Sequence, residues 1–153
     1  MKKKIYIFFL ILLGLLSYLR EVLFTSINAT IAGTPSFYAK TARIEFFLDK
    51  SAATLVQLKY GMTIGFTLLF ALITIVGLRL TFKNQLPSQL ALTLYGICGM
   101  IASLVIAYSL LTNRFDSVYS FLRLIIEYLH NPLVYLIISA GYLGVLYSQQ
   151  EKK

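Results

Sequence analysis

Long stretches without a charged residue alternate with short polar segments along this chain. Residues 60–78, 84–113 and 128–150 are each bounded by Lys, Arg or Glu, and a further apolar run at residues 5–19 follows three lysines. A helix needs about 20 residues to cross about 30 Å of hydrocarbon. The pattern therefore predicts an all-α fold, an integral membrane four-helix bundle. Its spans are expected at about 5–27, 60–78, 90–112 and 132–148.

The first apolar run allows two interpretations. A basic start followed by an apolar segment is typical of a secretory signal peptide, with Thr30 and Ala32 as the small residues of a cleavage site. Arg20 and Glu21 follow the run directly, however, and Ala32 lies well beyond its end. We favour an uncleaved helix that continues to Ile27, which places Arg20 and Glu21 inside the membrane boundary.

Residues 28–59 form the longest polar segment between two predicted spans. Turn-forming residues 33–36 end one helix, and Ser36 suits the N-cap of another. After this turn, mostly apolar residues recur at three- and four-residue steps and so form one stripe along a helix. The basic residues lie outside that stripe. We expect an amphipathic interfacial helix between the first and second spans, either lying on the bilayer surface or capping the bundle. The stripe consists of Phe37, Thr41, Ile44, Leu48, Leu55, Leu58 and Met62.

Composition strengthens the membrane prediction. Of 153 residues, 58% are apolar and 13% are charged, and the mean hydropathy is +0.77. A soluble chain of this size is about one quarter charged. The counts of Pro, Gly and Cys exclude collagen-like, disordered and disulfide-stapled proteins. Residues 1–153 are therefore expected to form a single transmembrane domain.

The net charge of +8 raises the question of nucleic-acid binding. Lys and Arg lie at the ends of the apolar runs and form no basic stripe with interleaved aromatic residues, so we expect no nucleic-acid partner. Charges at the borders of hydrocarbon favour membrane lipids with anionic head groups. The lysines at 2–4 and the compact turn with Arg79 and Lys83 favour a multi-pass protein of a bacterial inner membrane with both termini in the cytoplasm.

The chain contains one cysteine, Cys98, and one histidine, His130, which limits the metal sites and disulfides that it can form. One cysteine forms no intramolecular disulfide, and one histidine supplies neither bis-histidine haem ligation nor the usual zinc ligands. We therefore expect no cofactor and no metal. Because the chain shows no paired nucleophile and base, we also expect no catalytic residue.

Charged residues near the last predicted span are candidates for interaction. Helical spacing places Arg123, Glu127 and His130 on one face. We expect His130 to cap the mouth of the last span at the interface. Alternatively the three residues pair with another chain, or His130 protonates near neutral pH. An enzyme would require all three in one shared cavity.

Arg20 and Glu21 form a second candidate interaction site. Adjacent helical residues lie about 100° apart, so their side chains are not expected to face each other. Each would cost about 2.5–3.5 kcal/mol at the bilayer centre. We expect Arg20 to extend to the membrane edge, or to form an ion pair with the second span or with a partner protein.

Small residues recur at four-residue steps in three spans. Such faces let helix backbones approach closely. We expect them to pack within the bundle, with dimerisation or docking to a larger protein as the alternative. The principal pairs are Gly61 and Gly65, Gly99 and Ser103, and Ala140 and Gly144.

Several short motifs occur in a characteristic order. After the lysine-rich start come residues 17–24 (SYLREVLF), 82–84 (FKN), 121–123 (FLR) and 131–133 (NPL). This order resembles the small exosortase-system-associated membrane proteins, and the exosortase-F-associated group most. The resemblance implies an accessory role beside a membrane transpeptidase-like enzyme that processes sorted surface proteins.

The enzyme of such systems uses a Cys, an Arg and a His near the membrane face. Those roles do not transfer to Cys98, Arg123 or His130, because this chain is much shorter and Cys98 lies in mid-span. We predict a non-enzymatic accessory or scaffold protein that binds a larger membrane partner. The alternative is a small homo-oligomeric transporter or channel.

Overall fold

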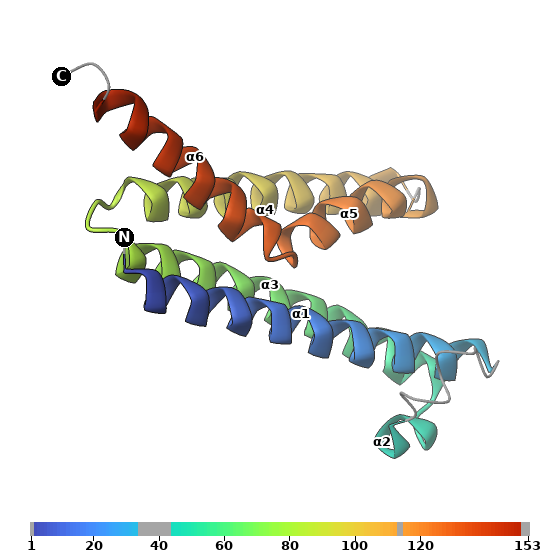
Figure 1. The fold of residues 1–153 in the computed structure, drawn as a ribbon. Coiled ribbons are helices and arrows are strands. Elements are labelled where there is room, and N and C mark those ends of the chain that lie inside the picture. Colours follow the sequence, from blue (N-terminus) through green and yellow to red (C-terminus); the bar gives the residue numbers. More distant parts are fainter. Residues whose placement is uncertain (1, 34–43, 113–114, 151–153) are drawn as a thin grey trace.

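Long apolar runs without internal proline form helices that extend beyond the predicted spans. The computed structural model describes residues 2–33, 44–112 and 115–150. Neighbouring helices α1, α3 and α4 run in alternating directions, α5 folds back along α4, and α6 turns away from it (Figure 1). The elements are α1 (Lys3–Ala32), α2 (Glu45–Leu48), α3 (Ala52–Thr81), α4 (Leu86–Thr112), α5 (Phe115–Leu129) and α6 (Leu133–Gln150).

Three of these helices are long and apolar enough to cross a membrane: α1, α3, and α4 over Leu86–Tyr108. The segments Phe121–Leu129 and Leu133–Gln149, bent by 62°, qualify as a fourth span when they are taken together. The chain is thus a multi-pass membrane protein with three to four spans. The start of α1 and the end of α6 lie toward the same end of the bundle (Figure 1).

The bend between α5 and α6 occurs at His130, Asn131 and Pro132. Proline has no backbone N–H, so it interrupts the helical hydrogen-bond pattern. The freed backbone groups find other partners: the Tyr95 hydroxyl donates to the Leu129 carbonyl at 2.9 Å, and the Leu133 N–H donates to Asn131 Oδ1 at 3.0 Å. These bonds stabilise a break in an apolar environment, where unpaired backbone groups are costly.

The antiparallel pair of α1 and α3 forms the largest helix contact. It is joined at one end by a hydrogen bond from the Lys2 N–H to the Thr81 carbonyl (3.0 Å), and at the other by one from Lys59 Nζ to Asn28 Oδ1 (2.8 Å). Between them, a Cβ built on Gly77 would lie 2.8 Å from the Phe9 ring. Glycine at 77 therefore permits the close approach of the two helices.

The segment before α3 differs from the expected amphipathic helix. Ser51 caps α3 by accepting a hydrogen bond from the Thr54 N–H at 3.2 Å. A new helix therefore starts at Ala52, and α2 contains four residues. Over residues 44–59 the structure thus has two helices separated at residues 49–51 in place of one amphipathic helix. The earlier part of the stripe, with Phe37, Thr41 and the proposed cap Ser36, lies outside the described residues.

A second, small core lies beneath α2. Phe47 is 4% exposed and packs with Ile27 of α1 and Leu55 of α3, while Leu48, a member of the expected stripe, is 45% exposed. The Ile44 N–H also donates to Ser26 Oγ at 3.2 Å. These contacts attach the described part of the segment to the end of the α1–α3 pair.

Replacing Gly77 by Leu is expected to destabilise the protein. The added side chain would overlap the Phe9 ring, and overpacking of this kind costs about 1–3 kcal/mol. Gly14→Leu is the matched control, because the Gly14 position is exposed and no described atom lies within 4 Å of an added Cβ. Unfolding in detergent, followed by circular dichroism, measures both variants. Equal stability would contradict the packing role of Gly77, and adding Phe9→Ala should restore part of the loss.

Candidate functional site

Arg20 lies on the inner face of α1. It follows the buried residues Leu13 and Leu16 at helical spacing, and Phe24 and Ile27 continue the same face. Its side chain is 15% exposed. α1 continues to Ala32, so Arg20 lies within the helix, and the expectation that its side chain reaches the membrane edge stays a prediction.

The arginine interacts with its own helix. Its Nη1 lies 3.8 Å from Glu21 Oε2, and its Cζ lies 5.1 Å from the centre of the Phe24 ring. The expectation that Arg20 and Glu21 do not face each other is therefore wrong, since two long side chains can meet even from adjacent positions. Glu21 is 70% exposed, and Thr25 Oγ1 lies 3.5 Å from its Oε1.

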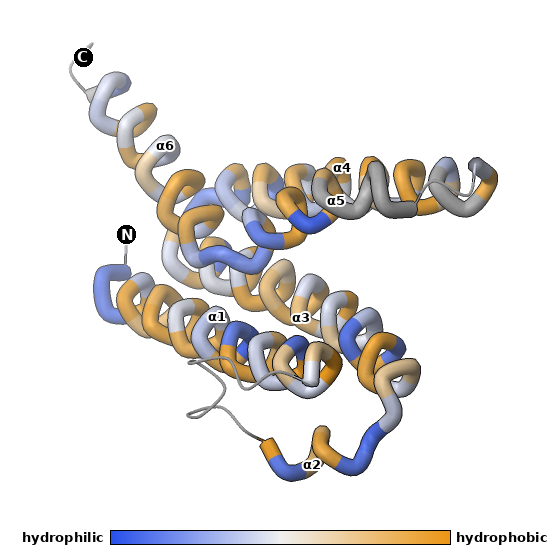
Figure 2. The backbone as a smooth tube through the Cα atoms, turned by 90° about the vertical axis from the view of Figure 1, so that its right-hand side faces the viewer, coloured by the Kyte–Doolittle hydropathy of each residue, from blue (hydrophilic) through white to orange (hydrophobic). Residues whose placement is uncertain are grey.

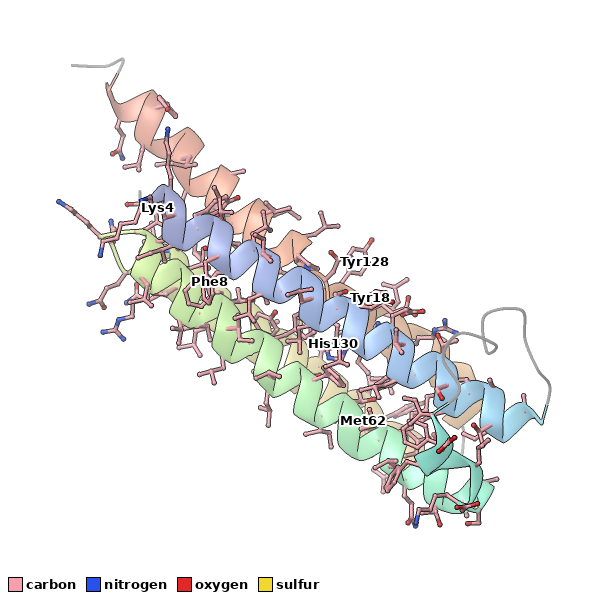
Figure 3. All side chains as sticks on the ribbon, turned by 60° about the horizontal axis from the view of Figure 1, so that its bottom comes forward. Lys4, Phe8, Tyr18, Met62, Tyr128 and His130 are labelled. Carbon is pink, nitrogen blue, oxygen red and sulfur yellow. The ribbon has the colours of Figure 1, made fainter. Side chains whose placement is uncertain are left out.

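His130 lies in the interior, against α3. It is 1% exposed, its ring stacks on Phe70 with centroids 5.3 Å apart, and its Nε2 lies 2.7 Å from Thr67 Oγ1. Figure 3 shows it about midway along the bundle. The expected interfacial cap is therefore wrong. The break that begins at His130 ends α5 beside α3, so the imidazole packs among aromatic rings.

The depth of this contact follows from helix geometry. At about 1.5 Å per residue, Thr67 lies about 18 Å from Arg79 and about 12 Å from Lys59 along α3. The uncharged part of α3 between those two residues matches the hydrocarbon thickness. His130 and Thr67 therefore meet near the middle of this uncharged stretch. Figure 2 shows hydrophilic positions in α1 and at the α5–α6 junction, within the length of otherwise apolar helices.

Arg123 and Glu127 lie apart from His130. They form an ion pair of 2.8 Å between Arg123 Nε and Glu127 Oε1, with the two side chains 67% and 48% exposed. The predicted common face of these three residues is thus divided: the ion pair is on the outer surface of α5 and His130 is inside. The shared cavity that an enzyme would need from them is not assembled. His130 instead lies beside the rings of Phe66 and Phe70.

The small-residue stripes face outward, against the expectation that they pack within the bundle. Gly61, Gly65, Gly99, Ser103, Ala140 and Gly144 are all exposed. A Cβ built on any of the glycines among them meets no described atom within 4 Å. The close approach of α1 and α3 occurs at Gly77, which was not predicted from the sequence. The sequence feature that indicates this face is the helical spacing of Gly77 with two further small residues, Thr74 and Thr81, which are also buried.

Fold and site together define a multi-pass α-helical membrane protein with a polar centre between α1, α3 and the α5–α6 junction. No protein-family model, curated protein or solved structure matches the chain. Its function therefore follows from its own residues. Thr67 and His130 meet at this centre, where the imidazole also contacts Phe66 and Phe70. Arg20 lies on the Phe24 ring, which in turn contacts Phe66.

The Thr67–His130 contact determines which ring nitrogen carries the proton. The Thr67 hydroxyl donates to the Thr63 carbonyl at 2.8 Å, which uses its single proton. Thr67 Oγ1 therefore accepts from Nε2–H of His130. Thr67→Val would leave this buried donor unpaired and should cost about 1–3 kcal/mol of stability.

The chain has one histidine, so histidine labelled with ¹⁵N gives the signals of one imidazole. In lipid nanodiscs we expect a protonated Nε2 and an unprotonated Nδ1 in the wild type, and a mixture of tautomers in Thr67→Val. Thr93→Val, on the exposed face of α4, is the control and should change neither the spectrum nor the stability. A wild-type ring protonated on Nδ1 alone would contradict the assignment.

Proposed function

We propose that the protein is a non-enzymatic accessory or scaffold protein of a bacterial inner membrane, and that it binds a larger membrane partner. The supporting observation is the outward orientation of the small-residue stripes on α3, α4 and α6. Between helices in lipid, association depends on close packing, and small residues allow backbones to approach. Stripes that no described residue covers are suited to contact with another protein.

The stripe on α4 is the preferred contact surface. In the most apolar stretch of α4, 11% of the residues are buried, compared with 22% in the corresponding stretches of α1 and α3. The exposed ion pair of Arg123 and Glu127 lies on α5, which packs beside α4. Charged groups are costly against acyl chains. A partner covering α4 and α5 would supply polar groups to this pair.

The proposed topology treats the bent α5–α6 pair as the fourth span of a four-helix bundle. The lysines at 2–4 and the turn with Arg79 and Lys83 lie at the end of the bundle where α1 begins and α6 ends (Figure 1). The positive-inside rule supports placing this end, with both termini, in the cytoplasm. The resemblance of the sequence makes an exosortase-type enzyme the first partner to test.

Leucine at both Gly99 and Ser103 should release the partner. Purification of the tagged wild type from its native membranes in a mild detergent should recover a second membrane protein at fixed stoichiometry. The double variant should recover about tenfold less, because the larger side chains prevent close backbone contact. Gly14→Leu, at an exposed glycine outside the stripes, is the matched control and should retain the partner. If the wild type is recovered alone, or if both variants retain the partner, the proposal is wrong.

A small homo-oligomeric transporter or channel is the second candidate function. It is supported by one observation: a half-buried arginine on α1 and a buried histidine at the break between α5 and α6 lie within apolar helices, where transporters bind ions and substrates. Purified protein in vesicles with a pH-sensitive dye should then give proton flux that Arg20→Gln abolishes and Arg123→Gln leaves intact. Vesicles that remain impermeable to protons would exclude this candidate.

A further inference from the structure

Basic residues gather at the end of the bundle where α1 begins and α3 ends. The Lys2 N–H donates to the Thr81 carbonyl at 3.0 Å, so the start of α1 lies directly beside the last turn of α3. Two basic segments that are far apart in the sequence therefore meet at this end, where Figure 3 shows Lys4. They form a basic surface that consists of the exposed residues Lys2, Lys3, Lys4, Arg79 and Lys83.

No acidic residue balances this charge within the described part of the chain. The first turns of α1 and α4 contain no Asp or Glu, and residues 76–85 contain none either. Like charges that are held close together repel each other, so the basic surface favours a bound anion. The ion pairs of the described residues lie elsewhere, between Arg20 and Glu21 and between Arg123 and Glu127.

The opposite end of the α1–α3 pair differs in its charge. Glu45 and Asp49 accompany Lys50 and Lys59 there, so the charges of the described residues balance. Lys59 Nζ donates to Asn28 Oδ1 at 2.8 Å, and the Lys50 ammonium lies over an aromatic ring of α2. The described lysines of that end thus have partners, whereas the side chains of the basic surface have none among the described residues.

Exposed apolar residues continue from the basic surface toward the middle of the bundle. They follow Lys4 on α1 and precede Arg79 on α3, at three- and four-residue steps that keep each stripe on one helix face. From 4 to 15 and from 79 to 68, each stripe rises about 16 Å, about half the thickness of the hydrocarbon layer. The stripes consist of Phe8, Ile11 and Leu15 on α1 and of Leu68, Leu72 and Val76 on α3.

We propose that this end of the protein binds an anionic phospholipid, with its phosphate on the basic surface and its acyl chains along the apolar stripes. Lysine ammonium and arginine guanidinium groups form charge-assisted hydrogen bonds with phosphate oxygens. A zwitterionic head group carries a positive group of its own, which the basic surface repels. The site therefore selects lipids of net negative charge.

Lipid binding at this end requires neither the accessory role proposed above nor a cytoplasmic location, because it depends on charge and depth alone. A soluble phosphate compound has the same head-group chemistry but leaves the apolar stripes unused. We therefore expect the lipid to bind and the soluble compound not to bind.

Native mass spectrometry of the full chain, purified in a mild detergent, measures bound lipid directly. Phosphatidylglycerol should bind about tenfold more tightly than phosphatidylcholine with the same acyl chains, because its head group has a net negative charge. Glycerophosphoglycerol, the head group without acyl chains, should show no binding at the same concentrations. Equal affinity for the two lipids, or for the lipid and the free head group, would overturn the proposal.

Lys4→Gln combined with Arg79→Gln should weaken phosphatidylglycerol binding by about 25-fold, because each basic residue near an anionic membrane contributes about fivefold in affinity. Lys50→Gln combined with Arg123→Gln removes the same charge outside the basic surface and is the matched control, with unchanged affinity. An unchanged affinity in the first variant, or an equal loss in the control, would contradict the site.

Two further measurements apply if the glutamine variant fails to fold. Lys4→Arg combined with Arg79→Lys keeps both charges and should bind phosphatidylglycerol as the wild type does. The affinity of the wild type for this lipid should fall as ionic strength rises, since salt screens exposed charges. An affinity that is independent of salt would exclude a site based on charge.

Discussion

Hydrocarbon offers no hydrogen-bond partner, and this constraint governs every part of the structure. It favours helices, whose backbone groups are satisfied within one segment. It also explains why the break between α5 and α6 carries dedicated hydrogen bonds: Tyr95 satisfies the Leu129 carbonyl, and Asn131 satisfies the Leu133 N–H. Among the described residues, the buried atoms Arg20 Nε and His130 Nδ1 are the exceptions, because neither has a hydrogen-bond partner there.

The existence and approximate position of the long helices could be predicted from the sequence, because length and hydropathy are local properties. The faces that the helices turn toward each other could not. In α1, α3, α4 and α6 the apolar residues surround the helix almost evenly, so no amphipathic pattern separates the inside from the outside. This is why the glycines at 61 and 65 were assigned to the interior while Gly77 was overlooked.

α5 illustrates the opposite case. It is strongly amphipathic, and the ion pair between Arg123 and Glu127 agrees with the prediction that these two residues share one face of a helix. His130 was expected on that same face but lies at the end of the helix, where the break redirects the chain. Helical periodicity applies only as far as the helix continues. The tertiary contacts with Phe70 and Thr67 determine the orientation of the ring beyond that point.

The inclination of α6 also affects the surrounding bilayer. α6 leaves its partner helix at 62° and diverges from the other helices toward the end of the bundle that holds the start of α1 (Figure 1). Residues 144–149 of α6 are accordingly exposed. In a bilayer, acyl chains take the place of neighbouring helices around this end of α6. How tightly those chains pack therefore contributes to the free energy of the protein.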